Sequence, residues 1–339
     1  MRFRCLLVLI WVGAKLYAQE DTVAHHAPSD SIRASYIRQF PDHFSVWGVI
    51  KSRSLGFDAR NIRTNEVVRY RPNGRTSLGV GLYLFEIAVE LAFAVPEDEA
   101  STQKFGTTDS RDVQLNVFGK AWGADVYWQR YEGFYLDDPN LASPTGFPQR
   151  ADIQSRNFGL SGFYVFDKQR FSLRSSFNYA EQQLQRHGSW MIIGTVNSFR
   201  ISGDSSLRSG NDVDTDFVRM RYTTFGLAPG YSYNYIYKKF LVNGTLGFGP
   251  AHNWVYVQLP GGTEVNRVSI NSYAVVRLAV GYNSERFFGG MGFSLQSRNL
   301  RVEDIRYSNS TSVFKLVLGY RFREVGFLKK RAIDLIKEL

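Results

Sequence analysis

The stretch FKLVLGYRF, residues 314–322, alternates its side-chain character with a period of two. Successive side chains of a β-strand point to opposite sides of the chain, so every second residue shares a face. In this stretch one face is entirely apolar or aromatic: Phe314, Leu316, Leu318, Tyr320 and Phe322. The period predicts a β-strand with one apolar face, and Lys315 falls on the other face.

The same period recurs through most of the chain, for example in residues 87–93, 113–117 and 171–179. Thirteen segments with strand character can be marked: 46–57, 77–84, 87–94, 112–120, 123–133, 156–166, 170–182, 188–199, 218–233, 239–257, 270–283, 286–299 and 311–322. A bacterial single-chain barrel has an even number of strands, so one segment is misassigned. We expect an antiparallel barrel of about 12 strands, with 14 as the alternative, and place the difficulty in residues 183–218.

Alternation alone also fits a soluble barrel or a sandwich, but the loop lengths separate these classes. Tight turns are expected at 167–169, 237–239 and 283–285, and long polar loops at 96–111, 132–155, 258–269 and 298–310. Short turns at one rim and long loops at the other are typical of a transmembrane β-barrel, whose apolar faces meet lipid. The predicted lumen-lining residues are Glu90, Asn116, Arg174, Asn178, Arg277 and Lys315.

The N-terminus indicates export. Arg2 and Arg4 precede an apolar run, and Ala18 offers a cleavage point, as in a signal peptide. The only cysteine, Cys5, lies inside this leader, so a mature chain would form no disulfide. We expect this organisation: signal peptide 1–18, periplasmic lead-in 19–43, outer-membrane barrel 44–323, and an amphipathic C-terminal periplasmic helix 324–339.

Composition agrees with a membrane barrel and argues against nucleic-acid binding. Aromatic residues make up 15% of the chain, with 26 Phe and 19 Tyr, as girdles at two membrane interfaces require. The formal net charge of +10 falls to +7 without the leader, and its basic residues are scattered along the strands. We therefore expect outer-membrane lipid and lipopolysaccharide as partners, no nucleic acid, and no cofactor.

Two constellations have the residue types of a chemical site. His187 and Ser189 lie two apart, so on a strand they share a face and His187 would accept the Ser189 proton. This arrangement resembles the His-x-Ser pair of two outer-membrane lipid hydrolases, the phospholipase A barrel and the lipid A deacylase. Asn197 and Glu181 are near in sequence, but neither matches the position that orients the histidine in those families.

The second constellation is Asp212, Asp214 and Asp216, which alternate like calcium ligands. Phe217 and Thr223 stand where an EF-hand loop requires Gly and Glu, so a solvated acidic loop is the alternative.

Several short motifs resemble a Gram-negative family, domain of unknown function 4421. They are Tyr70-Arg71-Pro72-Asn73, Leu78-Gly79-Val80-Gly81, Gly230-Tyr231-Ser232-Tyr233, Gly281-Tyr282-Asn283 and Gly319-Tyr320-Arg321-Phe322, with Tyr36-Ile37 and Gly188-Ser189. The resemblance implies an outer-membrane barrel and carries no established activity. The aromatic end of 314–322 also resembles the signal that outer-membrane barrels present to their insertion machinery.

Three functions follow as alternatives. The first is a pore for small polar or anionic solutes, lined by residues such as Arg174, Arg277 and Lys315. The second is a structural or surface-interaction barrel that contacts a partner through loops 134–155 and 200–217. The third, and the only enzymatic one, is a lipid hydrolase that uses His187 and Ser189. We expect a non-enzymatic barrel.

Overall fold

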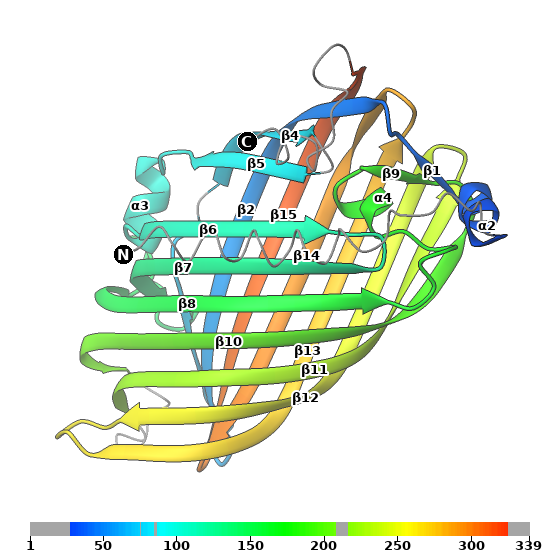
Figure 1. Ribbon diagram of the computed structural model, residues 1–339. Coiled ribbons are helices and arrows are strands. Elements are labelled where there is room, and N and C mark those ends of the chain that lie inside the picture. The colour runs from blue at the N-terminus through cyan, green and yellow to red at the C-terminus, as the bar shows by residue number, and fades with distance from the viewer. Residues whose placement is uncertain (1–27, 75, 85–86, 208–215, 325–339) are drawn as a thin grey trace, which may run out of the picture.

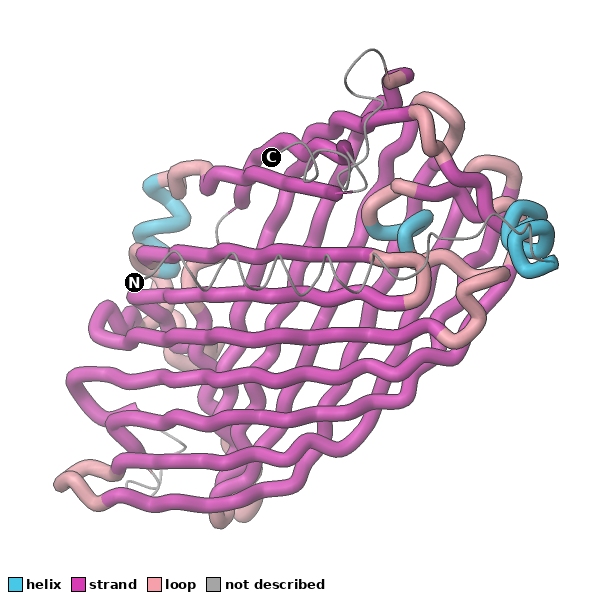
Figure 2. Tube along the Cα trace, in the orientation of Figure 1, coloured by secondary structure: helices cyan, strands magenta, loops and turns pink. Residues whose placement is uncertain are grey.

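The computed structural model describes residues 28–74, 76–84, 87–207 and 216–324, in which one antiparallel sheet closes on itself (Figures 1 and 2). Its strands are β2 (His43–Asn61), β3 (Val67–Arg71), β4 (Thr76–Leu84), β5 (Ile87–Ala94), β6 (Asp109–Phe118), β7 (Trp122–Leu136), β8 (Gln149–Val165), β10 (His187–Leu207), β11 (Phe217–Tyr237), β12 (Phe240–Gln258), β13 (Glu264–Asn283), β14 (Phe287–Val302) and β15 (Ile305–Arg323). The predicted signal peptide, the start of the lead-in and nearly all of the predicted C-terminal helix lie outside the described residues.

Among the described residues, three short helices and two short strands accompany the sheet. They are α2 (Pro28–Tyr36), α3 (Glu99–Phe105), α4 (Arg174–Phe177), β1 (Ile37–Gln39) and β9 (Glu181–Gln183). None of the described helices is long and apolar enough to cross a membrane.

Ten strands close the ring: β2, β3, β7, β8 and β10 to β15. β15 pairs with β2 along its whole length, from Arg323 opposite His43 to Ile305 opposite Asn61. The link through β3 is much weaker, because β3 shares only the pairs Tyr70–Leu136 and Arg71–Tyr135 with β7. β4 and β5 extend the sheet from β2, and β6 extends it from β7, so the expected count of 12 is not the number that closes the ring.

One interruption lies in the wall between β5 and β6. β5 pairs with β4 and β6 pairs with β7, but the sheet does not join β5 to β6. Their free edges face each other in Figure 1. We call this unpaired position the seam. The unpaired backbone groups of an edge strand normally face water. At the seam, apolar side chains of both strands, such as Phe93 and Val113, are exposed on the outward face.

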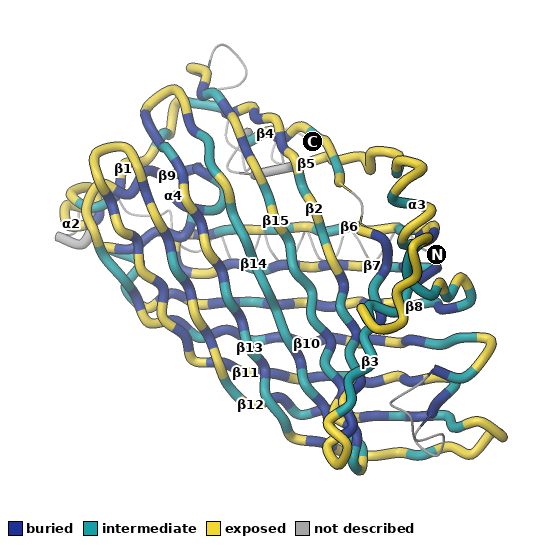
Figure 3. Tube along the Cα trace, turned by 180° about the vertical axis from the view of Figure 1, so that it is seen from behind, coloured by how far each residue is buried: buried dark blue, intermediate teal, exposed yellow. Residues whose placement is uncertain are grey.

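The two faces of the wall differ as a membrane requires. Burial alternates along the strands (Figure 3). On β12, Leu246 and Phe248 point outward and are 64% and 68% exposed, whereas Asn243 and Thr245 point inward and are buried. Exposed outward apolar side chains with buried inward polar ones reverse the pattern of a soluble barrel, so the wall faces lipid.

The strands are much longer than a membrane requires. A transmembrane strand needs about 9 to 11 residues, but β10 and β11 each have 21. The excess lies at the rim with the longer loops, such as 137–148, which we call the loop rim; the opposite rim, with tight turns at 238–239 and 284–286, is the turn rim. By the convention of transmembrane barrels the loop rim faces outside.

Because the strands extend beyond the lipid, two of the segments expected to be long loops are mostly strand. Residues 298–310 form the ends of β14 and β15, joined at Glu303 and Asp304, and 258–269 contain a connection of only 259–263. Their polar composition reflects strands that stand in water beyond the lipid, where the outward face no longer needs to be apolar.

The predicted strand 170–182 is wrong. The chain leaves the wall after β8, turns into the barrel and returns at β10, and residues 170–182 contain α4 and the first two residues of β9. This is therefore the misassigned segment, whereas 188–199 belongs to wall strand β10. The alternation suggested a wall strand because Phe171 and Leu173 form an apolar face. That face packs against the inner side of the wall and does not meet lipid.

The membrane assignment predicts a position-dependent cost for charge. Leu246→Arg would place a cation in the middle of the outward apolar band and should destabilise the folded barrel by about 2 to 4 kcal/mol. Thr263→Arg, in the connection at the loop rim, should change stability by less than about 0.5 kcal/mol. Urea unfolding in lipid vesicles measures both. Equal effects of the two variants would contradict this placement of the lipid band.

Candidate functional site

The interior near the loop rim is filled by an apolar core. Inward side chains of almost every ring strand meet there, and Phe57 stacks on Phe199 and Tyr307 at ring-centroid distances of 5.7 and 5.8 Å. Further members, all fully or almost fully buried, are Leu55, Tyr70, Phe134, Ile153, Phe217, Met220, Tyr222 and Val255. We call this cluster the outer core. It occupies the lumen that a pore would keep open.

Below the outer core, towards the turn rim, lies a cavity of about 220 Å³. Charged side chains that line it form ion pairs with one another. Glu90 on β5 accepts from Lys51 at 2.5 Å and also from Lys315, and Arg277 on β13 pairs with Asp125 on β7 at 2.7 Å. Asn116 on β6 donates to the other oxygen of Asp125 at 2.5 Å. At the seam, Arg53 on β2 pairs with Asp112 on β6.

Five of the six predicted lumen residues lie around this cavity: Glu90, Asn116, Asn178, Arg277 and Lys315. Asn178 belongs to the segment that folds into the barrel, as does Arg174 beside the rim, so neither comes from a wall strand as predicted. Sequence reasoning missed Lys51, Arg53 and Asp125. Their inward positions could have been found from the alternation in 46–57 and 123–133, since each is a charge on the face opposite the lipid.

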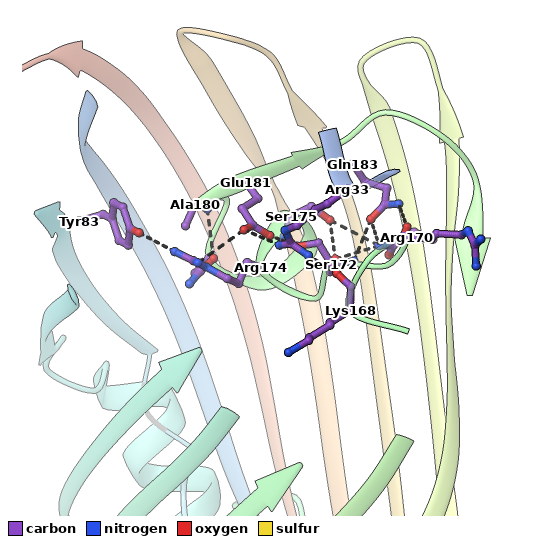
Figure 4. Close-up of polar contacts among 12 residues, drawn as sticks. Arg33, Tyr83, Lys168, Arg170, Ser172, Arg174, Ser175, Ala180, Glu181 and Gln183 are labelled. Carbon is purple, nitrogen blue, oxygen red and sulfur yellow. Dashed lines mark hydrogen bonds and ion pairs between the residues drawn. The ribbon is translucent and has the colours of Figure 1, made fainter. Parts of the chain in front are cut away.

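The cavity is covered on the turn-rim side by residues 166–186, which we call the plug. The plug is held by buried ion pairs (Figure 4). Arg33 of α2 donates to Glu181 of β9 at 2.7 Å and to the Lys168 carbonyl, while Arg174 lies 3.5 Å from Glu181. Burial alone would raise the pKa of Glu181, but Arg174, Arg33 and a hydrogen bond from Ser172 hold that pKa below its usual value.

Wall residues complete the attachment of the plug. Asn234 donates to the Ser172 carbonyl and Asn283 donates to the Glu181 carbonyl, both at 2.9 Å. Arg321 on β15 is buried, donates to the Tyr179 carbonyl and contacts the ring of Phe288 at 4.7 Å. β1 pairs with β9, so the lead-in also adds a strand to the plug.

The structure separates His187 from Ser189 chemically. His187 Nε2 lies 2.8 Å from Asp167 Oδ2. Burial raises the pKa of Asp167, but the contact with His187 outweighs this effect and leaves that pKa below its usual value. Ser189 is buried, donates to the Trp190 carbonyl and accepts from the Asp167 amide. The structure records no His187–Ser189 hydrogen bond in the described part of the chain. Asn197 and Glu181 are bound elsewhere, to Asn157 and Arg33.

The aspartate constellation is only partly described. Asp212 and Asp214 lie outside the described residues, and Asp216 is buried and accepts from Ser206 at 3.4 Å. Across the described ranges there is no cluster of three or more His, Cys, Asp or Glu side chains able to hold a metal ion.

Glu181 should control whether the plug stays in place. Glu181→Ala would remove the carboxylate that pairs with buried Arg33 and lies beside Arg174, which should weaken the plug by about 3 to 5 kcal/mol. Trypsin should then cleave within 168–186 while the barrel stays folded. The control Glu285→Ala removes an exposed pair with Arg38 and should leave the plug protected. Unchanged protection in Glu181→Ala would show that the ion pairs do not hold it.

The same pair predicts a pH dependence. The pKa of Glu181 is lowered by folding, so its stabilisation is complete above the unfolded pKa and is lost as the pH falls through the folded one. Hydrogen exchange of plug amides, corrected for intrinsic rates, should be constant from pH 7 to 5 and rise below about pH 4. Glu181→Gln should lack this acid-induced rise; a rise of equal size would assign it to other groups.

Comparison with known proteins gives the family but no activity. No curated protein matches the sequence. Similar solved structures include the outer membrane protease OmpT from Escherichia coli (11% identity, TM-score 0.38, covering 83% of this chain and 97% of that one). Others are the β domain of the Bordetella autotransporter BrkA (11%, 0.34, 79% and 98%) and Ail of Yersinia pestis (10%, 0.23, 83% and 99%).

These likenesses are too low to carry an argument about this chain. The family match is extensive, because residues 28–322 fit the domain of unknown function DUF4421. This range runs from α2 to the last strand and includes both the plug and the strand that closes the ring. The chain is a closed antiparallel β-barrel with an apolar outward face, and it belongs to the DUF4421 family.

Proposed function

We propose that this protein is a closed barrel of the outer membrane that acts through its surface and does not conduct solutes. The observation that carries the proposal is the filling of the interior at two levels. The outer core closes the lumen on the loop-rim side, and the plug covers it on the turn-rim side. A solute that entered the cavity from either rim would have to displace one of these packed layers.

The charges of the cavity also argue against a pore for anions. Lys51 and Lys315 share Glu90, and Arg277 is paired with Asp125, so most of the positive charge that would attract an anion is already neutralised. A selective pore instead keeps its charged groups available to the passing ion. The paired groups are better suited to holding β2, β5, β7, β13 and β15 together across the lumen.

The outer extension supports action at the surface. Strands that continue beyond the lipid, filled by an apolar core, form a stiff support that displays outward side chains and loops. Rigid strands present a contact surface with little loss of conformational entropy on binding. The protein thus fits the structural or surface-interaction alternative better than the pore, and the hydrolase alternative has no assembled His–Ser pair to support it.

Conductance separates these functions. In planar bilayers the wild-type protein should give no stable single-channel steps, because two layers block the lumen in series. Replacing 169–185 by a short Gly-Ser turn should still give none, since the outer core remains. The same deletion combined with Phe57→Ala and Phe199→Ala should open a measurable leak. Each variant must first show the heat-modifiable gel migration of a folded barrel. Stable steps from the wild type would overturn the proposal.

A further inference from the structure

Five arginines lie side by side on the outer surface of the wall. The register places Arg111 of β6 opposite Arg130 of β7, Arg130 opposite Arg156 of β8, Arg156 opposite Arg200 of β10, and Arg200 opposite Arg221 of β11. We call this set the arginine row. Four of the five are exposed and Arg130 is half-buried. They share the outward face with exposed lipid-facing residues of their strands, such as Phe158 and Phe225.

The height of the row is set by the residues beneath it. One outward position nearer to the membrane, roughly 7 Å along the strands, β6, β7 and β8 carry Val113, Trp128 and Phe158. At the same level β10 and β11 carry Ser198 and Thr223, and the neighbouring β12 carries Trp254. The four apolar side chains of this level are exposed. Aromatic side chains on the outward face mark the boundary between hydrocarbon and headgroups. The arginine row therefore stands at headgroup level on the loop-rim side, which is the outer leaflet.

Such a row is electrostatically unfavourable by itself. Like charges directly opposite each other on neighbouring strands destabilise a sheet. Within the described residues only Arg130 of the row has an ion pair, with Glu132 at 3.1 Å, while Arg221 lies over the ring of Tyr256 at 5.1 Å. The nearby carboxylate of Asp152 is engaged by Arg150. An external anion would relieve the repulsion among the four arginines of the row that have no ion pair within the described residues.

The surface is hollowed beside the same arginines. A depression of about 220 Å³ is lined only by polar residues, Gln154, Arg156, Arg200, Ser202 and Arg219. A second hollow of about 580 Å³ shares Arg200 and extends from Arg221 and Arg267 to Trp254 and Val268. The first offers three guanidinium groups with an amide and a hydroxyl, and the second joins guanidinium groups to apolar side chains at the lipid boundary.

We propose that the arginine row and its two hollows bind the phosphate groups of a phosphorylated glycolipid of the outer leaflet, a lipopolysaccharide. Guanidinium groups bind phosphate through paired charged hydrogen bonds, and five adjacent ones match a headgroup with more than one phosphate. Trp254, Val268 and Phe158 lie where its acyl chains begin, which a free phosphate would not use. This site goes beyond the surface function proposed above and does not depend on whether the lumen conducts.

The test compares two triple variants with the same change in charge. Arg156→Gln, Arg200→Gln and Arg221→Gln remove the centre of the row. The control, Arg60→Gln, Arg301→Gln and Arg306→Gln, removes three exposed arginines that neighbour one another on β2, β14 and β15 nearer the tip of the loop rim. All six side chains point outward, so the barrels should fold, and heat-modifiable migration checks this.

Binding is measured in neutral detergent with purified lipid A, dephosphorylated lipid A and inorganic phosphate as probes. We expect the wild type and the control to bind lipid A, and the row variant to bind it more than about tenfold more weakly. Dephosphorylated lipid A should bind the wild type as weakly as lipid A binds the row variant. Equal lipid A affinity of the two triple variants, or equal affinity of the wild type for both lipids, would overturn the proposal. Inorganic phosphate that binds as tightly as lipid A would overturn the glycolipid assignment.

Discussion

The structure depends on satisfying the backbone of its wall inside lipid. Hydrocarbon offers no hydrogen-bond partners, so a strand edge left open there costs several kcal/mol for each unpaired group. The antiparallel pairing of β15 with β2 meets this requirement where the chain's first and last wall strands join, and it does so over the full length of both strands. With that junction in place, inward and outward positions are fixed for every strand. The seam between β5 and β6 is the place where the requirement is not met by the sheet.

Alternation was enough to find the wall but not its contents. The segment around 314–322 and eleven other predicted segments correspond to wall strands because lipid enforces a strict apolar face. The plug was mistaken for a strand because Phe171 and Leu173 alternate with the polar Ser172 and Arg174, although these two apolar side chains pack inside the barrel. β3 was missed because only a few residues of it pair. The inward position of charges such as Glu90 was predictable from the two-residue alternation, but the ion pairs between them were not. Lys315 is distant from Glu90 in sequence, and only the strand register brings the two together.

The distribution of charge follows from the two environments of the wall. Inside, most cations meet a carboxylate, as Arg33 does with Glu181 and Arg277 with Asp125, because an unpaired ion would be buried. Buried Arg298 and Arg321 instead contact hydroxyl and carbonyl oxygens and aromatic rings. Outside, arginines stand next to one another with few carboxylates nearby. The exposed arginines of the wall thus contribute to the positive charge of the chain, of which composition shows only the total. The arginine row itself is invisible in the sequence, since its members are 19 to 44 residues apart and only pairing aligns them.

The contact between Arg321 and the plug has a consequence for the order of assembly. β15 is the last strand of the barrel, and the residue near its end that grips the Tyr179 carbonyl is also part of the pairing with β2. The chain therefore makes its final wall contact and its final plug contact in the same place. A plug still outside when β15 and β2 meet would have to enter through the turn rim and reach a buried guanidinium from within. Closure of the wall and attachment of the plug therefore meet at one residue of the last strand.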